Sequence, residues 1–144
     1  MQLDKDTLLT GTVAAPAQTL TSTAQSTNVI DQQATRSLNR GEQLELVVQV
    51  AVAYNAAGTL KASVRSDGSN RPSTILAEGP AWTLAQGLNT IGKQFRLPLT
   101  MVPGNTGEFL DANFTIAGAP TVGAVIAWIA RAGTTSHDAP VGGY

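Results

Sequence analysis

The only histidine of the chain, His137, stands next to Asp138, a pair that a Ser-His-Asp triad would use to activate a serine nucleophile. In such a triad the imidazole accepts the serine proton and the carboxylate orients the ring. The sequence contains no Gly-x-Ser-x-Gly elbow, and the Gly-rich range 132–144 around this histidine has no apolar periodicity that would hold a ring in place. We therefore interpret His137 as a solvated residue of a tail.

Metal binding and glycoside hydrolysis are the other chemistries that these residue types suggest. One histidine, no cysteine and singly placed carboxylates do not match the ligand spacings of metal sites, and Asp4 with Asp6 is a lone Asp-x-Asp. A glycosidase needs two carboxylates that face one cleft, which the ten acidic residues do not exclude. Sugar clefts usually carry aromatic platforms, however, and the chain has two Trp, two Tyr and three Phe. We predict a protein that is not an enzyme and uses no metal and no cofactor.

The chain is poor in charge and has no basic cluster. Charged residues make up 13% of the 144 residues, against about 25% in typical soluble domains. The net charge is -1 and the nine Lys and Arg residues are scattered, which argues against a nucleic-acid partner. The first residues do not form a signal peptide, and no apolar stretch approaches the ~18 residues of a membrane helix. We expect a cytoplasmic product whose neutral surface suits contact with other proteins, with no membrane partner.

Alternating apolar residues predict an all-β fold. The range 42–53 alternates with period two, and the range 59–66 repeats the pattern after a turn at 55–58, which predicts an antiparallel hairpin. Further runs of this kind cover 91–97, 110–116 and 121–131. Turn signals, among them Gly79-Pro80, separate the later runs. The spacing predicts an antiparallel β-sandwich or jelly roll with little helix.

The last run is apolar at both parities. Ala124, Ile126 and Trp128 share one parity, and we expect Trp128 on the inward face. Val125 and Ile129 have the other parity. A strand that is apolar on both faces is covered on both, so we predict that Val125 and Ile129 contact another subunit.

Composition divides the chain into three regions. Residues 1–25 are rich in Thr, Ala, Gln and Ser and are predicted to form an arm, whose apolar residues Leu3, Leu8 and Leu9 are candidates for contacts with other subunits. Residues 26–131 are predicted to form one folded domain, and residues 132–144 a tail. We expect that deletion of residues 1–20 leaves the fold intact.

Four further residues are candidates for partner contacts. Arg36, Arg40 and Arg71 lie in predicted turns or at strand starts, where they would either be solvated or pair with carboxylates of a neighbouring subunit. Trp82 follows Gly79-Pro80 in a predicted loop, where it would either plug the end of the sandwich or anchor a partner.

Four segments together resemble a known family. They read STNVID at 26–31, RGEQLELVV at 40–48, FLDANFTI at 109–116 and PTVGAVIAW at 120–128. In order and spacing they are similar to the jelly-roll cement (decoration) proteins of tailed bacteriophages, of the Bordetella-phage type, over about residues 20–131. Gln32 and Gln33 stand where such proteins tend to have Leu-Gly, so the following loop is expected to differ in shape.

The resemblance implies a function and partners. It implies a structural protein of the virion, made in the host bacterial cytoplasm, that sits on the capsid exterior and contacts a major capsid protein of HK97-like fold. It also implies a homo-oligomer, with a dimer favoured over a trimer. The alternative is a carbohydrate- or receptor-binding jelly-roll module of a phage appendage, for which Tyr54, Trp82 and Tyr144 would be the available aromatic platforms.

Overall fold

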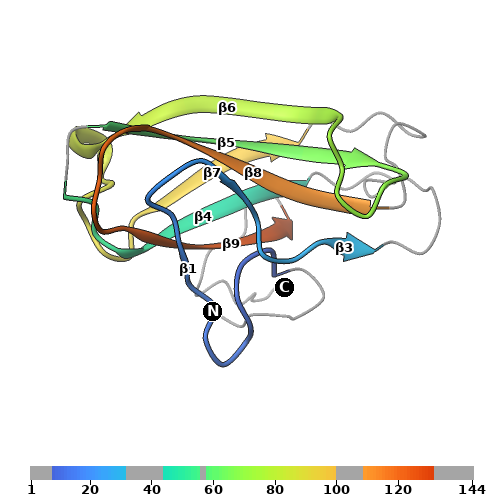
Figure 1. The fold of residues 1–144 in the computed structure, drawn as a ribbon, viewed down its shortest axis with the longest axis horizontal. Helices are drawn as coiled ribbons and strands as arrows, with labels where there is room; N and C mark the ends of the chain where they lie inside the picture. Colours follow the sequence, from blue (N-terminus) through green and yellow to red (C-terminus); the bar gives the residue numbers. More distant parts are fainter. Residues whose placement is uncertain (1–7, 32–43, 56–57, 100–108, 132–144) are drawn as a thin grey trace, which may run out of the picture.

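The computed structural model describes residues 8–31, 44–55, 58–99 and 109–131, with Arg131 described by its backbone alone. Apart from one short 3-10 helix, the regular elements of this part of the chain are all strands, which are drawn in Figure 1. The elements are β1 (Gln18–Thr19), β2 (Ala24–Gln25), β3 (Ile30–Asp31), β4 (Leu44–Val52), β5 (Gly58–Asp67), β6 (Ile75–Thr83), the short 3-10 helix η1 (Leu84–Gln86), β7 (Gln94–Leu99), β8 (Phe109–Gly118) and β9 (Ala124–Arg131).

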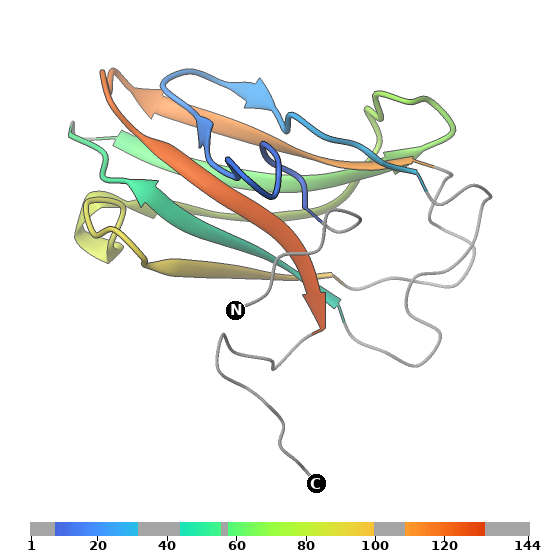
Figure 2. The same cartoon turned by 90° about the horizontal axis from the view of Figure 1, so that it is seen from below.

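The strands form two antiparallel sheets with jelly-roll topology. Sheet 1 has the order β1-β9-β4-β7, and sheet 2 has the order β2-β8-β5-β6, with β3 also paired to β8. With β3 set aside, the pairs are nested: β1 with β9, β2 with β8, β4 with β7 and β5 with β6. A long antiparallel ribbon that is rolled up gives this nesting, which defines a jelly roll. Figure 2 shows the two sheets as separate layers. The predicted antiparallel β-sandwich is confirmed.

The core lies between the apolar faces of the two sheets. The inward residues of the central strands β4 and β5 are fully buried, namely Leu46, Val48, Val50, Leu60, Ala62 and Val64. Trp82 of β6 stacks on Phe95 of β7 with ring centroids 4.7 Å apart, so this pair joins the edge strand of one sheet to that of the other. Such a stack adds about 0.5–1.5 kcal/mol to the burial of the two rings. The period-two pattern therefore identified the buried faces of β4 and β5 correctly.

The predicted hairpin of 42–53 and 59–66 is wrong. β4 pairs with β7 and β9, whereas β5 pairs with β6 and β8, so the two strands belong to different sheets. Period two tells which face of a strand is buried, but it does not tell which strand lies beside it. Here each strand buries its apolar face against the opposite layer, because the connection between them passes from one sheet to the other.

Two assignments near β6 and β7 are also wrong. Gly79-Pro80 lies inside β6 rather than in a turn, at a register break where Lys61 pairs with Ala81 but Ser63 pairs with Glu78. A proline is tolerated there because it falls at an irregularity in an edge strand. Trp82 is consequently a strand residue and not a loop residue. Ile91, the first residue of the predicted strand run 91–97, lies before β7 and is 69% exposed.

The inward face of β9 is the opposite of the predicted one. Val125, Ala127 and Ile129 belong to the core, whereas Trp128 points outward and is half-buried. Leu8 forms an isolated antiparallel bridge with Trp128, so the chain's own N-terminal segment flanks this outward position. Alternation is uninformative when both parities are apolar, which is why the sequence favoured the wrong face.

The described part of the predicted arm, residues 8–25, is packed into the jelly roll. Leu9 and Leu20 lie in the core, and the Leu9 N–H donates to Ala127 O over 2.8 Å. This range also supplies β1 to sheet 1 and β2 to sheet 2. The boundary predicted at residue 25 is therefore wrong, because residues 8–25 complete both sheets. Residues 1–7 and the predicted tail, 132–144, lie outside the described residues.

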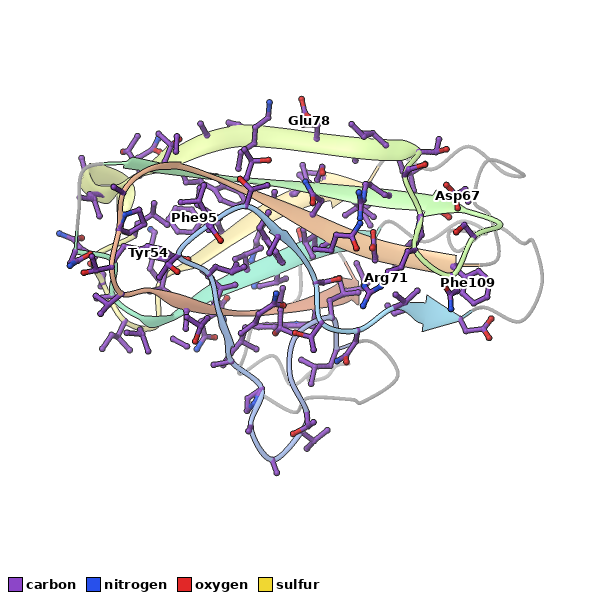
Figure 3. All side chains as sticks on the ribbon, in the orientation of Figure 1. Tyr54, Asp67, Arg71, Glu78, Phe95 and Phe109 are labelled. Atoms are coloured by element: carbon purple, nitrogen blue, oxygen red, sulfur yellow. The ribbon has the colours of Figure 1, made fainter. Side chains whose placement is uncertain are left out.

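Tyr54 closes the core beyond the end of β4. Its side chain is 5% exposed, and its hydroxyl has no hydrogen-bond partner among the described residues. Burial raises the pKa of Tyr54 to about 12. A Cβ atom at Gly123 would lie 2.2 Å from Tyr54 Cε1, so only glycine permits this close approach. Figure 3 shows Tyr54 and Phe95 at the same end of the sandwich.

We predict that Leu9→Ala destabilises the fold by about 2–5 kcal/mol, the usual cost of such a cavity in a core. The matched control is Val13→Ala, because Val13 is 52% exposed and surface changes usually stay within about 0.5 kcal/mol. Urea unfolding of the two variants and the wild type measures both values. Equal stability of all three would show that residues 8–25 are an arm after all.

We also predict an alkaline loss of stability that Tyr54→Phe removes. The folded pKa of Tyr54 lies above the ordinary value of 10.0, so in the window between them the folded state keeps a proton that the unfolded state releases. Stability therefore falls as the pH rises through this window, by at most about 1.4 kcal/mol per pH unit. Urea unfolding at about pH 9 and about pH 11 measures the slope.

The Tyr54→Phe variant should be at least as stable as the wild type near neutral pH, because it lacks the buried unpaired hydroxyl. The same slope in both proteins would contradict the assignment.

Candidate functional site: the outer face of sheet 1

The outward side chains of sheet 1 form rows across its strands. Trp128 of β9 is opposite Val47 of β4, and Val47 is opposite Arg96 of β7. Directly opposed residues of antiparallel strands share a face, so these three lie in one row, with Leu8 bridged to its Trp128 end. Val47 is 1% exposed although it points away from the core. Val47 is thus enclosed within the chain although it lies on the outer side of the sheet, and the half-buried Trp128 is the more accessible apolar side chain of the row.

A continuous chain of polar side chains crosses the same face. Arg96 Nη1 donates to Glu45 Oε1 in a salt bridge, and Arg96 Nη2 donates to Gln94 Oε1 over 3.1 Å. Gln94 Nε2 in turn donates to Gln49 Oε1 over 3.0 Å. These four residues will be called the polar row. Each side chain in it is fixed by the next, so a partner that docks on this face loses little of its binding energy to the ordering of side chains.

The Glu45–Arg96 pair carries the main charge of the polar row. The Glu45 side chain is 7% exposed and that of Arg96 is 30% exposed. A carboxylate this buried needs its guanidinium partner, because an unpaired buried charge is costly. Sequence reasoning missed both residues: Glu45 has the parity expected of a solvated residue, and its partner is 51 residues away.

The long edge strands are unsuited to adding a further strand. β7 is at the edge of sheet 1 and β6 at the edge of sheet 2, and they contain Pro98 and Pro80. Proline has no N–H to donate to an added strand and is one of the devices that protect sheet edges. Contacts with a partner are therefore expected from faces and loops of the sandwich rather than from strand addition.

Most of the described residues that the sequence suggested as contacts are buried in the chain itself. Exposure is at most 8% for Leu8, Leu9, Trp82, Val125 and Ile129. Side chains so enclosed offer little surface to a partner from the folded chain, and their contact with another subunit stays a prediction. Of the two alternatives for Trp82, its packing in the core favours the one in which it fills the sandwich. Leu3, Arg36 and Arg40 lie outside the described residues.

Arg71 finds its partners within its own chain. Its Nη1 donates to Ser26 O over 2.9 Å and lies 3.8 Å from Asp111 Oδ2, on the outer side of sheet 2. Asp111 is fully buried and also receives two hydrogen bonds from Arg65. Burial raises the pKa of Asp111, and the adjacent Arg65 guanidinium partly offsets that effect. The sequence did not reveal Asp111, because its alternating position is typical of a solvated residue.

The described residues contain no group of three or more His, Cys, Asp and Glu side chains placed to hold a metal ion. Within the same residues, no helix is long and apolar enough to cross a membrane.

Comparison with known protein families gives a match over most of the chain. The model of the Bbp16 family, which carries the name of a Bordetella phage protein, matches residues 14–129. The matched range begins ahead of β1 and ends within β9, so it spans the two sheets and the outer face described above. No curated protein matches the chain. Because the match covers most of the sequence, the chain belongs to the Bbp16 family.

Proposed function

We propose that this protein is a cement (decoration) protein of a phage head. In this role it binds the capsid exterior, bridges neighbouring subunits of a major capsid protein of HK97-like fold, and has no catalytic turnover. The observation that carries the proposal is the match of a phage protein family over residues 14–129, because this range covers most of the jelly roll. The resemblance of the four sequence segments to phage cement proteins supports it.

We assign the outer face of sheet 1 as the surface that contacts the capsid. Its polar row offers donors and acceptors in fixed positions, and Ile126 and Trp128 add half-buried apolar surface beside it. Apolar surface next to polar groups is common in specific protein interfaces. The protected edges of both sheets favour docking through a face.

A cement protein stabilises a shell by mass action. A protein that binds only the assembled shell stabilises it by about 4 kcal/mol per site when its free concentration is about 1,000 times the dissociation constant. A shell offers many equivalent sites, so a modest stabilisation at each site adds up to a large stabilisation of the whole shell. We also propose that the protein acts as a homo-oligomer, a dimer rather than a trimer, on the resemblance to phage cement proteins.

The alternative, a carbohydrate- or receptor-binding module of a phage appendage, receives no support from Tyr54 and Trp82, two of the aromatic residues that the sequence suggested as platforms. Such a module would present its aromatic side chains as platforms. Tyr54 and Trp82 are instead 5% and 6% exposed, and Tyr144 lies outside the described residues.

We predict that particles stripped of this protein release their DNA at a lower temperature than intact particles, because the bound protein stabilises subunit contacts. A dye that reports DNA release during a thermal ramp measures the difference, and added wild-type protein should restore the original temperature. Equal release temperatures for stripped, intact and restored particles would overturn the proposed function.

The contact face is tested with Ile126→Asp, which places a charge on the outward side of a central strand of sheet 1. We predict that this variant binds stripped particles at least about tenfold more weakly, as for the loss of an interface hot spot. The matched control is Thr115→Asp, which places the same charge at an exposed position on the outward side of β8 in sheet 2. Co-sedimentation with particles measures both affinities. Weaker binding of the Thr115 variant alone would move the contact to sheet 2.

A further inference from the structure

A short segment of the chain lies along the edge of sheet 2 and is held there by few strand contacts. This segment, residues 24–31, will be called the strap. Its two ends are the strands β2 and β3, each of two residues, and both pair with β8. Between them the Ser26 N–H donates to Ala112 O over 2.8 Å, and Ser26 Oγ accepts from the Ala112 N–H over 3.1 Å.

The strap also holds the N-terminal segment. Asn28 Nδ2 donates to Leu8 O over 3.2 Å and to Gly11 O over 2.7 Å, and the Asn28 N–H donates to Leu9 O over 2.9 Å. One side chain and its backbone amide thus link the strap to the chain that flanks β9. The strap is therefore one of two anchors of residues 8–11, the other being β9, where the Leu9 N–H donates to Ala127 O and Thr10 Oγ1 accepts from the Ala127 N–H.

A buried carboxylate lies on sheet 2 beside the strap. Asp111 of β8 is opposite Arg65 of β5, and both side chains point outward from the core. Arg65 Nε and Nη2 donate to the two Asp111 oxygens over 3.1 and 3.0 Å. The Asp111 side chain is 0% exposed and that of Arg65 is 11% exposed, so this pair is almost fully removed from water.

A second arginine connects this carboxylate to the strap. Arg71 belongs to the 68–74 loop between β5 and β6, which reaches toward β3 (Figures 1 and 3). Its Nη1 lies 3.8 Å from Asp111 Oδ2 and donates to Ser26 O over 2.9 Å, while Nη2 donates to Thr27 O over 3.3 Å. The loop itself is ordered by Asp67, whose carboxylate accepts from the Ser69 and Ser73 N–H groups over 2.8 Å each.

We propose that Arg65, Asp111 and Arg71 form an ionic clasp that keeps the strap closed on sheet 2. Asp111 attracts the Arg71 guanidinium, which in turn binds two strap carbonyl groups. Because the strap contributes little strand pairing of its own, loss of the clasp releases the strap as a unit and leaves the rest of the sandwich folded. Ala24 and Ile30 of the strap pack against the core but are only partly buried. Local opening below the global unfolding energy is typical of such edge segments. This inference concerns the isolated chain and does not rest on the proposed function.

The test is amide hydrogen exchange of the full-length protein, read by mass spectrometry of peptides. In Arg71→Met and Asp111→Asn, exchange in peptides covering 24–31 and 68–74 should rise by about 10- to 100-fold, the factor expected for lost hydrogen bonds to a charged group. Exchange in peptides covering β4 should stay at the wild-type rate. Arg71 is the safer site, because its side chain is 46% exposed and its replacement leaves the Arg65–Asp111 pair intact.

The matched control is Glu78→Gln, which removes the exposed Lys61–Glu78 ion pair of the same sheet and should leave strap exchange unchanged. Unchanged strap exchange in Arg71→Met would overturn the proposal, since the clasp would then hold nothing. A rise of equal size in the strap and in β4 would also overturn it, because the cluster would then support the whole fold rather than a releasable segment.

Discussion

The rest of the structure depends on the packing of two apolar strand faces against each other across the sandwich. β4 and β5 are inner strands of their sheets, and the middle residues of one face of each are fully buried. The connection between them crosses from one layer to the other, and the remaining strands pair around them in the nested order of a jelly roll. The N-terminal segment fills the last edge positions, which explains why Leu9 and Leu20 belong to the same core.

Sequence reasoning recovered the fold class and the buried faces of the central strands, because alternation records burial directly. It failed where an outward position of a strand is also covered by another segment of the chain. In β9 both parities are apolar, since Leu8 flanks the outward Trp128, and alternation then gives no answer. Leu8 and Leu9 looked like arm residues because the surrounding composition is polar, and only the pairing with β9 shows that they are internal.

The functional surface was harder to predict than the fold. Glu45 and Asp111 each sit at a position that alternation assigns to solvent, yet both are buried beside an arginine on a neighbouring strand. Such pairs depend on the register between strands that are far apart in sequence, and a single sequence does not specify that register. The two pairs lie on opposite outer faces of the sandwich: one fixes the polar row, and the other closes the strap.

The central claim is that this jelly roll is mounted on a phage head through the outer face of sheet 1. Cryo-electron microscopy of purified particles tests it most directly, since it locates the protein and orients the sheets together. The account predicts density for the protein on the capsid exterior with β4, β7 and β9 turned toward the shell. Density in a tail or appendage, or a capsid-bound protein that turns sheet 2 toward the shell, would contradict it.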